Sequence, residues 1–383
     1  MREDRTEPMD FSYFLPVNLV FGCGKASQAG ELTAQYGKNA LIVTGRSSAK
    51  KSGLYDRVAA SLERAGVKHL LFDKASQNPL TTTVEEGARM AEENGCDVIL
   101  GIGGGSIMDC AKGIAFLAVN RGDVNDYIYN RRAGRDALPI LLIPTTCGTG
   151  SEGNGFAVLT NPENGDKKSL RRNSIIPKVS IADPECMMTM PGKVLASVGF
   201  DALCHCMEAY TSRNAQPFTD AFCEYAMKLT AENLVKVYKG QGNREAWEKL
   251  TLASTMSGMA IHTAGVTLAH GMEHPASGLK DIVHGQGLAA LTPVVLAASE
   301  KGNPEKFAKI AEILGHGEEG CAGAVRWLLK ELDLDVTLSD LGIRQEDIPW
   351  MAKSCMKVSA VSVAANPVVF TEEEIAELYR KAL

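Results

Sequence analysis

"VILGIGGGSIMDCAKGIAF", residues 98–116, has the pattern of a buried strand, a turn of three consecutive glycines and the start of a helix. Glycines at such a turn let the backbone approach a ligand closely, and Ser106 adds a hydroxyl. The free amides at the helix start then face an anion, typically a phosphate, and Asp109 also suits a first helical turn. The spacing matches neither G-x-G-x-x-G nor a P-loop, so on this stretch alone a structural tight turn is an equally good interpretation.

A second turn of the same kind supports the ligand-binding interpretation. "IPTTCGTGSEGNG", residues 143–155, follows another apolar run and places hydroxyl side chains among glycines. Two small, hydroxyl-rich turns at the ends of neighbouring strands suit a long phosphorylated ligand such as a dinucleotide.

Outward from these turns, the first half of the chain alternates short apolar runs with amphipathic segments. Continuous apolar strands are buried on both faces, and their alternation with helices predicts a mostly parallel sheet in a Rossmann-like α/β domain. The predicted strands are 39–45, 69–72, 98–104, 139–146 and 179–183, and the predicted helices between them are 49–66 and 83–95.

From residue 192 onward the chain shows no convincing strand pattern. The segments 219–238, 322–332 and 371–383 have helical patterns, and Thr371 with Glu374 forms a capping box at the start of the last one. We therefore expect an α/β nucleotide-binding domain over 1–190 and an all-helical metal-binding domain over 191–383, with the site between them.

Composition excludes several classes of partner. The net charge is −6, and no long run of Lys or Arg is present, which argues against nucleic acid or an anionic membrane surface. No apolar run reaches the roughly eighteen residues of a membrane span, and "MREDRTEPMD" lacks the apolar core of a signal peptide. The ten cysteines are scattered without a C-x-x-C pair, which predicts free thiols in a reducing cytoplasm.

A cluster of histidines in the second half indicates a metal site. "DALCHCMEAY" (201–210) places Asp201 and His205 four residues apart, on one face of a helix, and His270 and His274 have the same spacing. Pro275 and Gly278 are expected to end that second helix, so that His284 lies on a new segment.

Each histidine alone is better interpreted as a core or capping residue, but five of the seven lie within eighty residues: His205, His262, His270, His274 and His284. Three imidazoles and one carboxylate, from Asp201, His205, His270 and His284, form a reasonable ligand set for Fe²⁺ or Zn²⁺. Cys204 and Cys206 flank His205 but cannot both share its face, so they are expected to be packing residues.

Together these motifs resemble the iron-containing (group III) alcohol dehydrogenases. The motifs are "GGGSIMDCAK" (103–112), "PTTCGTGSE" (144–152), "GFDALCHCMEAYTS" (199–212) and "HGMEHPASGLKDIVHG" (270–285), and the resemblance extends from "VFGCGKA" (20–26) to the helical C-terminus. It implies a dehydroquinate synthase-like fold, in which a nucleotide-binding α/β domain and a helical metal-binding domain enclose a cleft.

The resemblance also implies roles for individual residues. The implied metal ligands are Asp201, His205, His270 and His284. The implied cofactor contacts at the pyrophosphate are Gly104, Gly105 and Ser106, and those at the adenosine and ribose are Thr145, Thr146 and Thr149. Further cofactor contacts are Asp109, Asn78 and Lys167. Without this family resemblance, Asn78 would be interpreted as a turn residue before Pro79, and Lys167 as a solvated surface charge.

One departure concerns the choice of cofactor. NAD-preferring relatives have an Asp after the second strand, whereas Gly45 stands at that place here, as in NADP-preferring ones. Ser47 and Ser48 are expected to donate hydrogen bonds to a 2′-phosphate, with Arg46 and Lys50 supplying charge. NADP is therefore the expected cofactor, with NAD as the alternative. The same residues also suit a solvated loop that caps a helix.

The expected activity is reversible hydride transfer between NAD(P)(H) and a small primary alcohol or aldehyde, in a homodimer or larger assembly. His274, one turn from His270, is the candidate proton relay. The substrate pocket is expected to be formed by 156–160, 255–262 and the C-terminal helices. The alternatives are a glycerol dehydrogenase, a maleylacetate reductase, a dehydroquinate-synthase-like lyase, or a metal- and nucleotide-binding protein without turnover.

Overall fold

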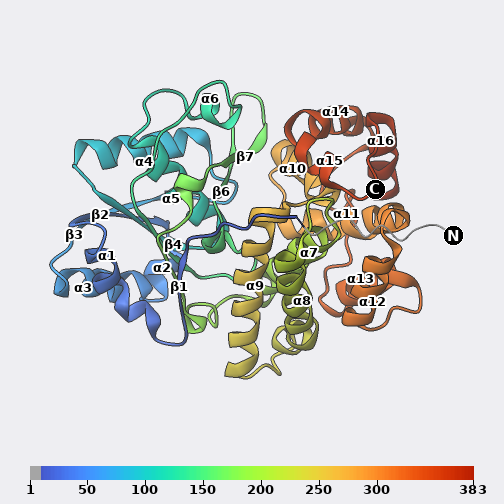
Figure 1. The fold of residues 1–383 in the computed structure, drawn as a ribbon, viewed down its shortest axis with the longest axis horizontal. Coiled ribbons are helices and arrows are strands. Elements are labelled where there is room, and N and C mark those ends of the chain that lie inside the picture. The colour runs from blue at the N-terminus through green and yellow to red at the C-terminus, as the bar shows by residue number, and fades with distance from the viewer. Residues whose placement is uncertain (1–9) are drawn as a thin grey trace.

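A six-stranded parallel sheet organises the first half of the protein (Figure 1). The computed structural model describes residues 10–383, so the charged N-terminal segment used above to argue against a signal peptide lies largely outside the described residues. The strand order is β1-β8-β5-β4-β2-β3, and β6 and β7 form a separate antiparallel hairpin. The strands are β1 (Asn18–Phe21), β2 (Asn39–Gly45), β3 (Lys68–Ala75), β4 (Val98–Gly103), β5 (Ile140–Pro144), β6 (Phe156–Thr160), β7 (Lys167–Arg171) and β8 (Val179–Ala182).

Helices cover both faces of this sheet and make up the second half of the chain. The helices of the first half are α1 (Ala29–Ala34), α2 (Ser48–Lys51), α3 (Leu54–Arg64), α4 (Thr81–Glu93), α5 (Gly105–Leu117) and α6 (Val124–Ile128). Those of the second half are α7 (Gly192–Thr211), α8 (Pro217–Tyr238), α9 (Arg244–Ala264), α10 (Leu268–Lys280), α11 (His284–Ser299), α12 (Pro304–Leu314), α13 (Gly320–Glu331), α14 (Ile348–Val358), α15 (Ala360–Ala365) and α16 (Glu372–Lys381). The 3-10 helices are η1 (Lys25–Gln28), η2 (Ser151–Gly153), η3 (Asn173–Ile175), η4 (Pro184–Cys186), η5 (Glu300–Gly302) and η6 (Gln345–Asp347).

The two-sided burial of the strands explains their continuous apolar runs. In β2, Ala40 and Ile42 pack with α1 to α3 on one face, while Leu41 and Val43 pack with α4 and α5 on the other. Successive side chains of a strand point to opposite faces, so a strand covered twice needs apolar residues at every position. The predicted parallel α/β architecture is confirmed.

The two glycine-rich turns lie side by side at the carboxyl edge of the sheet. Gly103, the last residue of β4, pairs with Pro144, the last residue of β5. The turn after β4 leads into α5 and the turn after β5 into η2. Ligands of parallel sheets bind at this edge.

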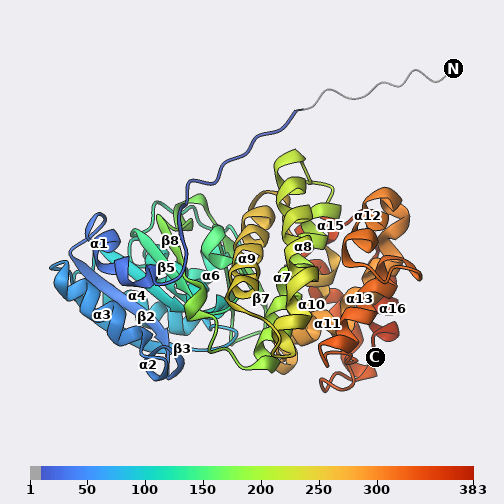
Figure 2. The same cartoon turned by 90° about the horizontal axis from the view of Figure 1, so that it is seen from below.

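The second half packs beside the sheet as a helical body (Figure 2). In the described residues no strand follows Ala182, and the predicted Thr371–Glu374 capping box is present. No helix among residues 10–383 has the length and apolar character that a membrane crossing requires. All ten cysteines are free thiols, and Cys204 and Cys206 are buried in the helical core as expected.

The two halves touch backbone to backbone at a pair of glycines. A Cβ on Gly258 of α9 would lie 1.9 Å from the carbonyl oxygen of Gly150, just before η2. Gly150 also has a left-handed φ of 57°. A side chain at either position would separate the sheet half from α9.

Two expectations about secondary structure are wrong, and three strands were missed. The segment 49–66 is two helices, because Gly53 adopts a left-handed φ of 69° between α2 and α3. Neither β1 nor the β6–β7 hairpin was predicted. Helix α10 continues through Pro275 and Gly278 to Lys280. Residues 268–277 of α10 are all buried, so tertiary packing outweighs the backbone hydrogen bond that Pro275 cannot make.

Candidate metal and nucleotide site

One cavity lies between the sheet edge and the helical half, with about 790 Å³ of space including its open mouth. Residues of both halves form its wall. The predicted site residues on it are Asn78, Gly105, Ser106, Asp109, Thr149, Lys167, Asp201, His205, His270, His274 and His284. The other predicted cofactor residues, Gly45, Ser47, Ser48, Gly104, Thr145 and Thr146, lie along the carboxyl edge and are not on this wall.

Three histidines converge on one carboxylate oxygen. The Nε2 atoms of His205, His270 and His284 lie 3.6, 3.3 and 3.6 Å from Asp201 Oδ1. Within residues 10–383, neither Asp201 Oδ1 nor His270 Nε2 has a hydrogen-bond partner, although both are buried. Buried polar atoms without partners are rare unless something else binds them.

The spacing of these atoms fits a metal ion. Ligand atoms about 2.1 Å from a tetrahedral metal are about 3.4 Å from one another, close to the contacts measured here. Ligand atoms of Asp201, His270 and His284 all lie within 4.8 Å of one another. His205 is 3.6 Å from Asp201 but lies outside this mutually close set. Helix α7 supplies Asp201 and His205, α10 supplies His270, and His284 is the first residue of α11.

Two buried glutamates orient the imidazoles from behind. Glu208 Oε1 lies 2.5 Å from His270 Nδ1, and Glu273 Oε2 lies 2.5 Å from His284 Nδ1. A carboxylate at Nδ1 fixes the proton there and leaves Nε2 free to bind a metal. Sequence reasoning missed both glutamates. Their spacing could have identified them, because Glu208 lies three residues after His205 and Glu273 three residues after His270, each pair on one helix.

The charges around the site also suit a divalent cation. Asp201, Glu208 and Glu273 are buried carboxylates, and Lys167 is the buried ammonium beside them, 3.5 Å from Glu273. With neutral imidazoles, three carboxylates and one ammonium leave two negative charges, which a divalent ion balances.

The pKa shifts follow from these charges. Burial alone would raise the pKa of Asp201, but His205, His284 and His270 outweigh it and lower that pKa. Burial lowers the pKa of His205 to about 4. At His270 the carboxylates of Glu208 and Asp201 outweigh burial and raise the pKa to about 10, so the surroundings of this imidazole favour a positive charge.

His274 lies beside the ligands without joining them. Its ring centroid is 6.4 Å from that of His270 and 6.0 Å from that of His284, and it lines the cavity. Burial and the nearby Lys167 lower its pKa well below the ordinary value, so the imidazole is neutral near pH 7.

Three predicted cofactor residues already have partners inside the protein. Asp109 accepts hydrogen bonds from Ser151 Oγ (2.6 Å) and the Val158 amide (2.9 Å), which ties α5 to η2 and β6. Asn78 donates to Asp281 Oδ1 (2.6 Å), and Lys167 is buried against Glu273 rather than solvated. Their proposed contacts with a cofactor remain predictions.

A buried lysine that the sequence analysis did not identify anchors the second glycine-rich turn. Lys112 Nζ donates to the Ser151 carbonyl and hydroxyl, to Asn154 Oδ1 and to the Phe156 carbonyl, at 2.6, 2.8, 3.0 and 2.8 Å. Burial lowers its pKa to about 8. This lysine fixes the position of η2 relative to α5.

Fold and site together combine a sheet edge of the kind that binds nucleotides with a cluster of side chains that could hold a metal ion. Residues 16–184 match the family described as "Iron-containing alcohol dehydrogenase", and residues 195–383 match "Fe-containing alcohol dehydrogenase family, C-terminal". The chain belongs to the iron-containing alcohol dehydrogenase family. It is an enzyme that transfers a hydride between a nicotinamide cofactor and a small alcohol or aldehyde.

The relatives match almost the whole chain. It is 36% identical to the 1,3-propanediol dehydrogenase of Citrobacter freundii, covering 97% of this chain and 98% of that protein. It is 35% identical to the NAD-dependent methanol dehydrogenase of Bacillus methanolicus, covering 97% and 100%. An archaeal halo-thermophilic alcohol dehydrogenase from a Red Sea brine pool superposes with a TM-score of 0.95 at 33% identity, covering 98% of this chain and all of the other.

Proposed function

We propose that the protein reduces a small aldehyde with NADPH, or oxidises the corresponding primary alcohol, at a single Fe²⁺ held by Asp201, His205, His270 and His284. One observation carries this proposal: three imidazole Nε2 atoms surround a carboxylate oxygen that has no hydrogen-bond partner among residues 10–383, in the same cavity as the N-terminus of α5. Zn²⁺ is the alternative ion, because this ligand set suits both metals.

Each part of the chain has its own task in this proposal. When bound, the metal acts as a Lewis acid on the oxygen of the alcohol or aldehyde. Gly104, Gly105 and Ser106 bind the pyrophosphate at the start of α5, and Thr145, Thr146 and Thr149 line the adenosine side. Asn78, Asp109 and Lys167 complete the cofactor site. The neutral imidazole of His274 accepts the hydroxyl proton in oxidation and returns it in reduction.

The test is an activity screen of the purified protein after loading with Fe²⁺ or Zn²⁺. We expect about one ion per chain by elemental analysis and turnover of short aldehydes with NADPH. A protein that binds both metal and cofactor but converts no substrate in a broad panel would support the non-catalytic alternative instead.

The proposed preference for NADP(H) rests on Gly45 at the end of β2. A Cβ there would lie 3.4 Å from Ile107 Cδ1, so the position has room for a side chain, yet none is present. Arg46, Ser47 and Ser48 are exposed beside it, and the Ser47 hydroxyl makes no capping hydrogen bond to α2. Lys50, also expected to supply charge, is 2.6 Å from Asp73 and so is already paired.

We therefore expect kcat/KM to be higher with NADPH than with NADH by about ten-fold or more, since a charge-assisted phosphate contact contributes roughly 1.5–3 kcal/mol. Gly45→Asp should shift the preference toward NADH, because a carboxylate repels the 2′-phosphate and accepts hydrogen bonds from a free 2′-hydroxyl. Steady-state kinetics with both cofactors measure this. Equal or better kcat/KM with NADH in the unmodified enzyme would contradict the proposal.

We also propose that the enzyme works in the cytoplasm as a homodimer or larger assembly, with the domain division near residue 190. The ten free thiols support a reducing compartment. Light scattering of the purified protein measures the assembly.

A further inference from the structure

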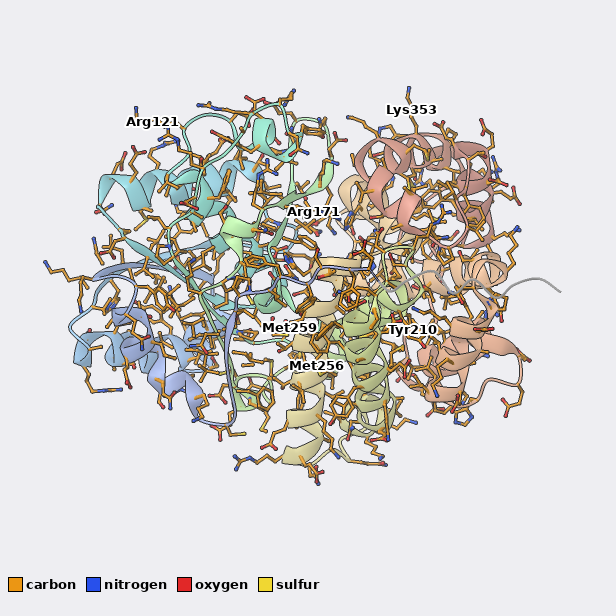
Figure 3. All side chains as sticks on the ribbon, in the orientation of Figure 1. Arg121, Arg171, Tyr210, Met256, Met259 and Lys353 are labelled. Carbon is orange, nitrogen blue, oxygen red and sulfur yellow. The ribbon has the colours of Figure 1, made fainter. Side chains whose placement is uncertain are left out.

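The β6–β7 hairpin presents one face to the cavity. Phe156 pairs with Arg171 across the hairpin, and Val158 pairs with Ser169. These four side chains line the cavity, whereas Leu170 on the opposite face packs into the core of the sheet half. The cavity wall therefore contains a guanidinium, as Figure 3 shows by the position of Arg171 between the two halves.

Arg171 has no carboxylate partner within residues 10–383. Its guanidinium carbon lies 4.7 Å from the centroid of the Phe156 ring, a cation–π contact that fixes where the group sits. Burial lowers its pKa, but a guanidinium in a protein stays charged. Arg171 is half-buried, and a charge largely removed from water is normally paired. The neighbouring Lys167 follows that rule through Glu273, and Arg171 does not.

The surroundings of Arg171 carry an excess of positive charge. Lys168 donates to the Val358 carbonyl, and Arg172 donates to backbone carbonyls and Asn130, so these two cations bind neutral oxygens and bring no carboxylate to the region. The nearby carboxylate of Asp166 is bound by Lys357 at 2.7 Å. Such a region attracts anions from solution.

Arg171 and His274 together line a second hollow, which adjoins the first and also includes Ser359 and Ser362. The Ser359 hydroxyl is buried and has no hydrogen-bond partner in the described part of the chain. An unpaired cation and an unpartnered hydroxyl thus lie in one hollow, next to the histidine that borders the metal ligands.

We infer that the substrate of this enzyme is an aldehyde or alcohol that carries an anionic group, a carboxylate or a sulfonate, and that Arg171 binds this group. The inference rests on the proposed function. In reduction, a hydride passes from the reduced nicotinamide to the carbonyl carbon and a proton to its oxygen. The cofactor leaves oxidised, and the anionic group is unchanged. Ser169 and Ser359 line the same hollow as Arg171.

Pairs of aldehydes in which a methyl group replaces the anionic group test the inference on the metal-loaded enzyme. Succinate semialdehyde is compared with butanal, and sulfoacetaldehyde with propanal, so that the carboxylate and sulfonate arms are separate. We expect a kcat/KM at least about ten-fold higher for the anionic member of one pair. This ratio corresponds to the free energy that one charge-assisted hydrogen bond contributes. The difference should shrink as ionic strength rises.

Arg171→Gln should remove this preference, mainly by raising the KM for the anionic aldehyde. The kcat/KM for the neutral aldehyde and the KM for the cofactor should each change by less than about two-fold. Arg171→Lys should restore part of it, because a point charge replaces the planar fork. Arg121→Gln is the matched control, since Arg121 lies exposed on the far side of the sheet half (Figure 3) and should behave as the unmodified enzyme.

The outcomes separate this inference from the proposed function. Equal kcat/KM for charged and neutral aldehydes in the unmodified enzyme overturns the inference and leaves the proposed function intact. A raised KM for the cofactor alone in Arg171→Gln also overturns it, because the guanidinium would then bind a cofactor phosphate. Absence of turnover with every aldehyde overturns the proposed function and the inference together. Circular dichroism and metal content of each variant verify its folding.

Discussion

His270→Ala and His284→Ala are expected to hold well below one metal ion per chain and to lose turnover. Each change removes one of the three nitrogen atoms around Asp201 Oδ1 and leaves an open position. Even a group that only orients a ligand costs about 10–100-fold in metal affinity or activity when it is removed, so loss of a ligand should cost more. Elemental analysis after dialysis, together with aldehyde reduction rates, measures both effects.

His274→Ala is the matched control, because the same residue type is truncated in the same cavity. This variant should keep its metal and turn over more slowly, since His274 lies beside the ligands without joining them. Full metal content and full turnover in either ligand variant would refute the assignment of that residue. Loss of metal from His274→Ala would make it a ligand.

The largest expected effect on stability comes from Lys112→Met. The substitution keeps much of the side-chain volume but removes the ammonium from four oxygen acceptors and from the neighbourhood of two buried carboxyls, Asp109 and Glu152. Burial already raises the pKa of both carboxyls with Lys112 in place. Leaving a buried acceptor without its donor costs about 1–3 kcal/mol, so the loss of these four hydrogen bonds should be large. Chemical denaturation should show this loss in the free energy of unfolding.

Two further variants decide whether the charge is responsible. Asp109→Asn combined with Lys112→Met should recover part of the lost stability, because the carboxylate no longer needs a counter-ion. Lys249→Met, which removes a partly exposed lysine paired with Glu245, should leave the denaturation midpoint unchanged. A Lys112→Met protein as stable as the unmodified one would show that the hydrogen bonds around Lys112 contribute little to the fold.

The sequence predicted those features that depend on local spacing. Asp201 and His205 share a helical face because they are four residues apart, and the glycine-rich turns follow strands that are apolar at every position. The hairpin was missed because β7 carries Lys and Arg at positions that face a cavity, so it lacks the apolar alternation of an ordinary strand. The end predicted for α10 at Pro275 was wrong because burial of the surrounding turns is a tertiary effect.

Glu208 and Glu273 were missed as site residues for the same reason, because their burial depends on tertiary packing. A glutamate in a helix is usually solvated, and only the packing of α7, α10 and α11 against one another buries these two beside imidazoles. Likewise, Arg171 has no carboxylate partner among residues 10–383 because residues distant in the sequence determine what lies around it.

The contact between Gly150 and Gly258 has a consequence for recombining members of this family. The sheet half supplies one glycine and α9 the other, and a Cβ on either would overlap the partner's backbone. A chimera that joins the nucleotide-binding half of one relative to the helical half of another will therefore dock correctly only if the first parent carries glycine at the position of Gly150 and the second carries glycine at the position of Gly258. Shuffling experiments that aim to combine one cofactor preference with another substrate range should select their parents by this pair first.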